Sequence, residues 1–189
     1  MERLIVGLTG ASGSIYGIRF IEELLKAGFE LHVIATETAK QVINYELGRP
    51  LEEILSEFCG PVILENIQDF FAGPASGSYP CKAMIVAPCS MGTLGAIAHG
   101  LSSNLLVRSA LVCLKERRPL VVMPRETPLG AIDLENMLKL SHAGATIFPA
   151  APAFYHHPAS IDELTDFMVG KVLDHLGISN TLFKKWKGL

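Results

Sequence analysis

Mostly apolar runs of strand length alternate with amphipathic segments along this chain. Apolar runs of about 4–8 residues are typical of buried β-strands. They cover residues 4–9, 30–35, 83–87 and 119–123, with shorter runs at 62–64 and 146–148. Between the runs, apolar residues recur at helical spacing, as they do at Ile15, Ile18, Ile21 and Leu25. Strands that alternate with helices predict an α/β protein with a doubly wound, mainly parallel sheet.

Polar residues mark the starts of the predicted helices. Thr36 follows the second strand and can cap a helix at residues 37–47. Ser160 and Glu163 are spaced as a capping box for a helix that runs to residue 176. Further helices are expected from about residue 15 to 28 and at residues 50–58, 104–115 and 134–141, with a small-residue helix that ends at 99. No linker or repeat interrupts the pattern, so residues 1–189 are predicted to be a single domain.

Composition narrows the classes of function. Of the 189 residues, 49% are apolar and 19% are charged, so we expect some surface to be buried in an oligomer. The net charge is −3 and no basic run stands out, which argues against a nucleic-acid partner. No apolar run is long enough to span a membrane. The four cysteines lack C-x-x-C spacing and the first strand starts almost at once, so we expect a cytoplasmic protein with reduced thiols.

The first strand runs into a glycine-rich turn and then into a helix. Four glycines between residues 7 and 17 let the backbone approach an anion, and free N–H groups at a helix start point toward it. Thr9, Ser12 and Ser14 add hydroxyl donors. The spacing matches neither G-x-G-x-x-G nor a Walker A loop, so it predicts a phosphate without identifying the molecule. A tight turn that binds nothing is the alternative.

Other predicted strands also end in polar loops. Thr36 follows the second strand, residues 90–93 follow the strand at 83–87, and Arg125 and Glu126 follow the strand at 119–123. Ligands of parallel sheets bind beyond the carboxyl ends of the strands. We therefore expect these loops to share one site with the first loop.

Six short motifs occur in order along nearly the whole chain. They are Thr9–Gly13 (TGASG), Pro74–Ser78 (PASGS), Pro88–Thr93 (PCSMGT), Leu114–Val121 (LKERRPLV), Pro124–Pro128 (PRETP) and Pro149–His156 (PAAPAFYH). As an ordered set they resemble the flavin prenyltransferase (UbiX) family. The resemblance implies a Rossmann-like (flavodoxin-like) three-layer fold that binds flavin mononucleotide (FMN).

The resemblance also implies an activity. Members of this family join a dimethylallyl group from dimethylallyl phosphate to N5 and C6 of reduced FMN, without a metal. The product, prenylated FMN, is the cofactor of UbiD-type decarboxylases, and the family forms homododecamers. This chain is accordingly expected to be a transferase, with such a decarboxylase as the recipient of its product.

The family's site residues carry over to matching positions of this chain. The residues expected to bind FMN are Gly10, Ala11, Ser12, Thr36, Ser90, Met91, Gly92, Thr93 and Arg125. Those expected to bind the prenyl donor are Lys115, Arg125, Glu126, Tyr155, Lys171 and Trp186. Those expected to take part in catalysis are Glu126, Lys115, Glu46, Tyr155 and Ser12. Three positions depart from many members, which have serine at Thr36, arginine at Lys171 and, in some, tryptophan at Phe70.

These residue types suit the chemistry. Lys115, Arg125 and Lys171 supply positive charge to a departing phosphate, and Tyr155 supplies a hydrogen-bond donor. Aromatic faces such as those of Phe70 and Trp186 attract an allylic cation and exclude water. Proton transfer falls to Glu126, to Glu46 or to the released phosphate.

Several alternatives stay open from the sequence. The chain could be an FMN-dependent decarboxylase of a cysteine-type or aromatic acid, although the Pro-Ala-Ser-Ala-Asn-Thr loop of peptidyl-cysteine decarboxylases reads Pro-Ala-Ser-Gly-Ser-Tyr at residues 74–79. It could also be a flavin-binding module without chemistry. Lys115 could belong to a charged helix end, Glu46 could be a solvated surface acid, and Trp186 could simply pack the tail. A zinc site at His156 and His157 is disfavoured, because adjacent residues in an extended segment point apart.

Overall fold

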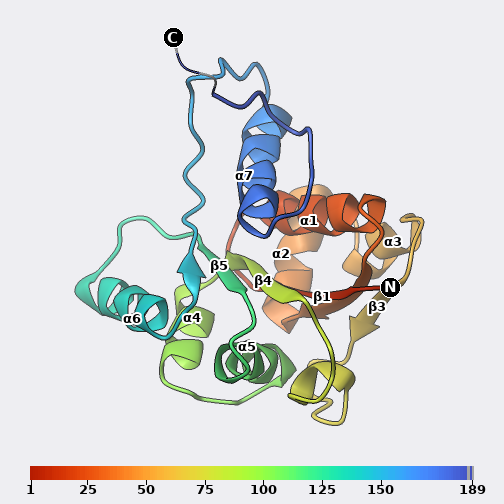
Figure 1. Cartoon of the computed structure of the whole chain (residues 1–189), viewed down its shortest axis with the longest axis vertical. Coiled ribbons are helices and arrows are strands. Elements are labelled where there is room, and N and C mark those ends of the chain that lie inside the picture. Colours follow the sequence, from red (N-terminus) through yellow and green to blue (C-terminus); the bar gives the residue numbers. More distant parts are fainter. Residues whose placement is uncertain (187, 189) are drawn as a thin grey trace.

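The six apolar runs of the sequence become the six strands of one sheet. The structure is a computed structural model that describes residues 1–186 and 188 (Figure 1). The strands are β1 (Arg3–Leu8), β2 (Glu30–Ala35), β3 (Val62–Glu65), β4 (Ala83–Cys89), β5 (Leu120–Pro124) and β6 (Thr146–Ile147). They lie in the order β3-β2-β1-β4-β5-β6, and every neighbouring pair is parallel. This confirms the doubly wound sheet, whose strand order reverses direction between β1 and β4.

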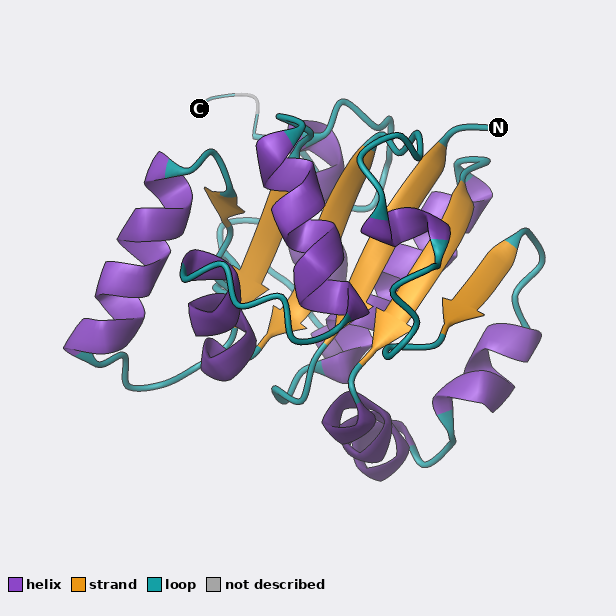
Figure 2. Cartoon of the chain, turned by 90° about the horizontal axis from the view of Figure 1, so that it is seen from below, coloured by secondary structure: helices purple, strands orange, loops and turns teal. Residues whose placement is uncertain are grey.

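Helices cover both faces of the sheet (Figure 2). They are α1 (Ser14–Lys26), α2 (Glu37–Leu47), α3 (Leu51–Ser56), α4 (Met91–Ala98), α5 (Leu105–Lys115), α6 (Ala131–His142) and α7 (Ile161–His175), with a short 3-10 turn η1 (Gly73–Ala75). One buried cluster joins α1, α2, α3 and α7 to one sheet face, and a second joins α4, α5 and α6 to the other. The predicted three-layer α/β architecture is therefore confirmed. None of the helices in the described residues combines the length and the apolar character needed to cross a bilayer.

Helix α1 lies unusually close to the sheet at Gly17. A Cβ atom placed there would stand 2.5 Å from the carbonyl oxygen of Ala87 in β4. Only glycine allows this approach, because a carbonyl in a central strand has no room to retreat. The start of α1 is thereby held against the carboxyl end of β4, next to the first loop.

One helix start and one predicted capping bond differ from the sequence prediction. Helix α6 begins at Ala131 rather than 134, since the Asp133 carboxylate accepts a hydrogen bond from Gly130 N at 2.9 Å and stabilises an earlier turn. At α7, Glu163 N donates to Ser160 Oγ as predicted, at 3.2 Å. The reciprocal bond of the predicted capping box shifts by one residue, because the Glu163 carboxylate accepts from Ala159 N at 2.7 Å.

Candidate active site

Three loops are joined at the carboxyl edge of the sheet by one hydroxyl and one guanidinium. The buried Thr9 hydroxyl donates to Pro88 O at 2.8 Å and accepts from Ser90 N at 2.7 Å. Arg125 donates from its backbone N to Cys89 O at 3.2 Å and from Nε to Ser12 O at 3.1 Å. The loops that follow β1, β4 and β5 therefore form one rigid rim.

The polar residues after β2 and β4 act as helix caps on this rim. Thr36 Oγ1 accepts from Ala39 N at 3.0 Å at the start of α2. Ser90 Oγ accepts from Thr93 N at 3.4 Å at the start of α4. Because β2, β1 and β4 are neighbours and parallel, the prediction that Ser12, Thr36 and Ser90 lie at one sheet edge is confirmed. Their contact with a flavin stays a prediction.

The side chain of Glu46, which lies in the last turn of α2, caps the start of α1. Its carboxylate accepts hydrogen bonds from Gly13 N at 3.1 Å and from Ser14 N at 2.8 Å. Burial alone would raise the pKa of this carboxyl, but hydrogen bonds from the Ser12 hydroxyl and from the backbone of Ser14 and Gly13 outweigh burial and hold the pKa below its ordinary value. Glu46 is therefore an ionised, helix-capping acid, and not a side chain free in solvent.

Because Glu46 binds the first loop, the expected phosphate position moves from that loop to the start of α4. The N–H groups of the first loop, which the sequence offered to an anion, already bind a carboxylate. The start of α4 is open instead, since nothing lies within 4 Å of the place where a Cβ of Gly92 would stand. The first N–H groups of a helix lack partners within the helix and attract phosphate. Residues 91 and 92 thus suit an anion such as the phosphate of a mononucleotide, whereas Thr93 N already donates to Ser90 Oγ.

Lys115 lies at the other edge of the sheet. It ends α5, which leads directly into β5, whereas Arg125 follows the last residue of β5. Lys115 Nζ lies 3.1 Å from a Glu116 carboxylate oxygen. It lines a cavity of about 660 Å³ whose other wall is the loop that holds Phe70 and Ser76. Within one chain, Lys115 and Phe70 are therefore apart from the carboxyl-edge rim.

Tyr155 and Trp186 meet on a third part of the molecule. The segment after β6 extends away from the sheet before α7 returns, and the C-terminal tail runs beside it (Figure 1). The Tyr155 ring packs edge-on against Trp186, with centroids 5.6 Å apart, and against Phe167 of α7 at 5.8 Å. Trp186 thus packs the tail against the Tyr155 segment, which was the alternative considered from the sequence. It also lines, together with Tyr155, a cavity of about 440 Å³.

The remaining predicted residues are exposed. Glu126 sits in the loop after β5, where its carboxylate accepts from Thr127 N at 3.0 Å. Lys171 is exposed on α7. The structure accordingly divides the predicted site into three parts: the carboxyl-edge rim, the Lys115 cavity and a C-terminal arm that holds Tyr155 and Trp186. Within one chain these three parts stay separate.

Arg108 is a site candidate that the sequence reasoning missed. It lies on α5 seven residues before Lys115 and lines the same cavity, with Nε donating to Ala75 O at 2.9 Å. Residues seven apart share a helix face, so the spacing of these two cations on a predicted helix was the available signal.

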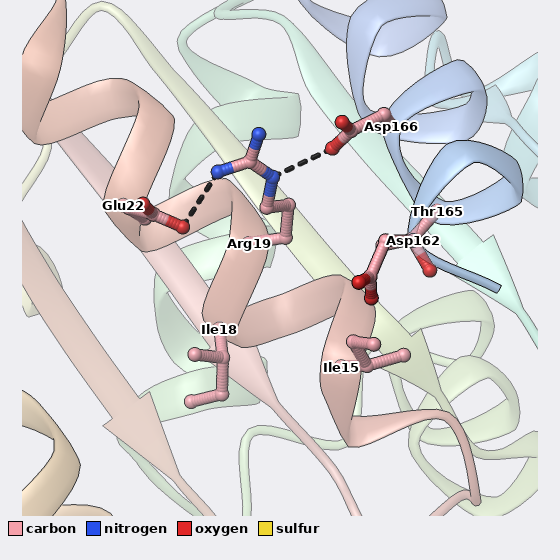
Figure 3. A pocket seen from close by; sticks show the side chains of 7 residues that line it. All are labelled: Ile15, Ile18, Arg19, Glu22, Asp162, Thr165 and Asp166. Carbon is pink, nitrogen blue, oxygen red and sulfur yellow. Dashed lines mark hydrogen bonds and ion pairs between the residues drawn. The ribbon is translucent and has the colours of Figure 1, made fainter. Parts of the chain in front are cut away.

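A separate pocket lies between α1 and α7 (Figure 3). Its volume is about 310 Å³, and Arg19 crosses it to pair with Asp166 at 2.6 Å and Glu22 at 2.6 Å. None of the predicted site residues lines it. The Arg19–Asp166 pair joins α1 to α7, the Arg19–Glu22 pair lies within α1, and neither carries a sign of a binding function. Among residues 1–186 and 188, no group of three or more His, Cys, Asp or Glu side chains is placed to hold a metal ion.

Comparisons with known proteins identify the family and the fold of this chain. The Flavoprotein family model matches residues 1–173. The chain is 50% identical to a flavin prenyltransferase UbiX of Alkalihalophilus pseudofirmus, covering 97% of this chain and 95% of that protein. The solved structure of AnUbiX (PadA1) in complex with FMN and dimethylallyl pyrophosphate superposes with a TM-score of 0.95 at 41% identity, covering 100% of this chain and 98% of the other. A dodecameric FMN-dependent UbiX-like decarboxylase from Escherichia coli O157:H7 superposes with a TM-score of 0.91 at 39% identity, covering 99% and 100%.

Proposed function

Because this chain belongs to the flavin prenyltransferase (UbiX) family, we propose that it transfers a dimethylallyl group from dimethylallyl phosphate to N5 and C6 of reduced FMN. The observation that carries this proposal is the full-length superposition on a structure that holds both FMN and a dimethylallyl donor. The preformed rim of loops after β1, β4 and β5 supports it, since these contacts hold the three loops together at the sheet edge where ligands of parallel sheets bind.

The rim residues have distinct tasks in this proposal. The N–H groups at the start of α4 and the hydroxyls of Ser90 and Thr93 hold the FMN phosphate. Gly10, Ala11, Thr36 and Arg125 line the space beside it. Reduced FMN, when bound, supplies the nucleophilic nitrogen.

Glu46 and Ser12 are suited to move a proton at this rim. The Ser12 hydroxyl helps to lower the pKa of the Glu46 carboxyl, which is therefore ionised. A carboxylate hydrogen-bonded to a hydroxyl can take up a proton through that hydroxyl. Glu126 in the exposed loop after β5 is the second carboxylate at this edge and a further candidate for the same task.

The prenyl donor requires residues from the other two groups. Lys115, Arg108 and Lys171 bring positive charge for the leaving phosphate, and Tyr155 brings a hydroxyl. Trp186 and Phe70 supply aromatic faces that attract an allylic cation and exclude water. We infer that these groups reach the rim from neighbouring copies of the chain, so that one site is assembled from several subunits.

A homododecamer is the assembly we propose. One structural relative is described as dodecameric. Large apolar side chains are exposed on the two parts of the chain that we expect to contact neighbouring copies. Phe71 lies beside the Lys115 cavity and Trp186 lies on the C-terminal arm. Such residues mark surfaces that are covered in an assembly. The free state of all four cysteines supports a cytoplasmic location.

Product mass tests the activity. Purified protein is incubated anaerobically with reduced FMN and dimethylallyl phosphate, and in parallel with the diphosphate, and the flavin is analysed by mass spectrometry. Gain of one C5H8 unit supports prenyl transfer, and the parallel sample identifies the better donor. Unmodified flavin together with carbon dioxide release from an aromatic or cysteine-type acid would favour the decarboxylase alternative, which one relative's name describes. Activation of an apo UbiD-type decarboxylase by the product tests the proposed recipient.

A further inference from the structure

The loop between β3 and β4 is bound to the sheet through a buried histidine of β2. His32 is 3% exposed and lies on the sheet face that α5 covers, in register with Ile5 and Met84. Its Nε2 lies 2.8 Å from the hydroxyl oxygen of Tyr79, a half-buried residue near the end of the loop, and the two rings meet edge-on at 5.3 Å. A histidine in the apolar core therefore has its partner in the loop that forms one wall of the Lys115 cavity.

Glu65 of β3 sets the direction of this hydrogen bond. Glu65 Oε1 lies 2.6 Å from His32 Nδ1, and a carboxylate can only accept, so Nδ1 carries the ring proton. In the neutral ring Nε2 is then an acceptor, and the Tyr79 hydroxyl donates to it. The Glu30 carboxylate stands 3.6 Å from Nε2, too far for a hydrogen bond. Glu65, His32 and Tyr79 thus form one chain of hydrogen bonds that runs from the sheet to the loop.

Tyr79 also shapes the loop from within. Its ring packs on Gly73, where a Cβ atom would stand 2.7 Å from a ring carbon. Its backbone N donates to Ser76 O at 3.2 Å and closes a tight turn. Residues 76–78 of this turn line the Lys115 cavity. The position of the Tyr79 side chain therefore determines where this wall of the cavity stands.

The loop is bound on its other side to α5 and the turn after it (Figure 1). Arg108 Nε donates to Ala75 O at 2.9 Å. Arg118 donates to Gly77 O at 2.5 Å and to Tyr79 O at 2.8 Å. The wall is thus fixed by one set of contacts to the helix that carries the cations of the cavity, and by the Tyr79 hydroxyl to the sheet. Loss of this hydroxyl would leave the wall attached on the helix side and released from β2.

We propose that Tyr79, acting through its hydrogen bond to His32, is a positioning residue for the prenyl donor. It holds residues 76–78 opposite Lys115, so that the cavity has its binding shape before the donor arrives. The inference rests on the proposed function and deepens it, because it assigns part of the donor affinity to a hydrogen bond outside the cavity. The FMN rim is joined by other contacts, those of Thr9 and Arg125, and does not depend on this one.

Donor kinetics of Tyr79→Phe test the proposal, because the phenyl ring keeps the contact with Gly73 and loses the hydroxyl. In the full-length assembled enzyme the KM for dimethylallyl phosphate should rise about fivefold, while kcat changes by less than about twofold and the Kd for FMN stays the same. A displaced wall weakens ground-state and transition-state binding alike, which raises KM alone. Thr165→Val is the matched control: it removes another buried hydroxyl, which donates to Ile161 O on α7, and should leave KM unchanged.

A double-mutant cycle and an exchange measurement separate this role from a general loss of stability. In a His32→Leu background, Tyr79→Phe should change KM by less than about twofold further, because the acceptor is already gone. Hydrogen–deuterium exchange needs no substrate and no second variant. Amides of residues 73–79 should exchange faster in Tyr79→Phe than in the wild-type protein, and those of residues 9–14 should be unchanged.

The failure of this inference is distinguishable from that of the proposed function. With an active wild-type enzyme, an unchanged KM in Tyr79→Phe, unchanged exchange of residues 73–79, or independent effects of the two substitutions in the cycle would each overturn the positioning role alone. A wild-type protein that makes no prenylated FMN would overturn the proposed function and this inference with it. Circular dichroism verifies that the variants fold, and the exchange measurement on Tyr79→Phe decides the matter if His32→Leu does not.

Discussion

Glu46 shows how one side chain links the last turn of α2 to the first turn of α1. Its carboxylate binds two backbone N–H groups at the positive end of the α1 dipole. Charges at such positions are worth about 0.3–1 kcal/mol. The hydropathy pattern gave no hint of this contact, because the partners lie 32 and 33 residues away in sequence.

Replacing Glu46 by Gln should lower the free energy of unfolding by about 0.5–1 kcal/mol at pH 7, since the amide keeps an acceptor but loses the charge. The pKa of Glu46 is lowered in the folded state from its ordinary 4.5, so its contribution is fully present above 4.5 and is lost as the pH falls through the folded value. Urea unfolding at fixed protein concentration should therefore show the two proteins converging below pH 4.5. Glu135→Gln, an exposed acid on α6, is the matched control and should change nothing.

Tyr155→Phe should leave FMN binding unchanged, because the FMN rim belongs to other loops. It should slow prenyl transfer by ~10–100-fold if one donor worth roughly 1.4–2.7 kcal/mol acts mainly in the transition state. The phenyl ring retains the edge contacts with Trp186 and Phe167, so the fold of the arm is preserved. Anaerobic stopped-flow spectra of the flavin measure the rate. Tyr45→Phe, on the exposed face of α2, is the control, and an unchanged rate in Tyr155→Phe would remove this hydroxyl from the mechanism.

At the scale of single residues, prediction worked where chemistry is local. Thr36 and Ser160 were predicted as caps because each has a hydroxyl directly before a predicted helix, and both hydroxyls accept the expected backbone hydrogen bond. Arg108 was missed because its seven-residue spacing from Lys115 does not show that the loop at residues 70–78 forms a cavity with both cations.

Elements depend on close backbone approaches that a side chain would block. Gly17→Ala should destabilise the protein by about 1–3 kcal/mol, since the new methyl group would meet the Ala87 carbonyl and push α1 from β4, against a gain in helix propensity of less than about 1 kcal/mol. Thermal unfolding measures the change. Gly95→Ala in α4 is the matched control: its Cβ would face only the Asn136 side chain at 3.3 Å, so it should be neutral or stabilising. Equal behaviour of the two variants would contradict the close-packing argument.

Strands were easier to predict than helix ends for a physical reason. A buried parallel strand is apolar along its whole length, as β4 is, so it stands out in the sequence. Helix α6 buries only Leu140, and its start is fixed by Asp133 and not by an apolar face. The apolar pattern accordingly began the helix three residues late, at 134 instead of Ala131.

At the scale of the whole molecule, a site built from several subunits predicts that two poorly active variants regain activity when they assemble together. Lys115→Met and Tyr155→Phe should each be poorly active alone, because each damages a group that every site requires. When the two variants are co-assembled in equal amounts, about one quarter of sites should receive both intact groups if these come from different subunits. Recovery of activity to that extent, with Lys139→Met mixed with wild-type protein as the control, supports the shared site. No recovery would mean that both groups come from one chain.

The assembly itself could not be derived from the hydrophobic pattern. The sequence placed Lys115, Arg125 and Tyr155 in one site only through family resemblance, and the single chain keeps them apart. Low charge content pointed to buried surface, and the exposed Phe71 and Trp186 give that surface a location. Light scattering at micromolar concentration should report a large oligomer, and a stable monomer would remove the basis for a shared site.

The Thr9 and Arg125 contacts that join the rim all lie within one chain, whereas the Lys115 cavity opens at the opposite sheet edge. Under the proposed site and assembly, a newly made chain is expected to load its flavin before it meets any neighbour and to become competent for transfer only on assembly. The proposal thus predicts an order of biogenesis in which cofactor capture comes first and reactivity last. Dissociated subunits would form a reservoir that retains flavin without consuming prenyl donor.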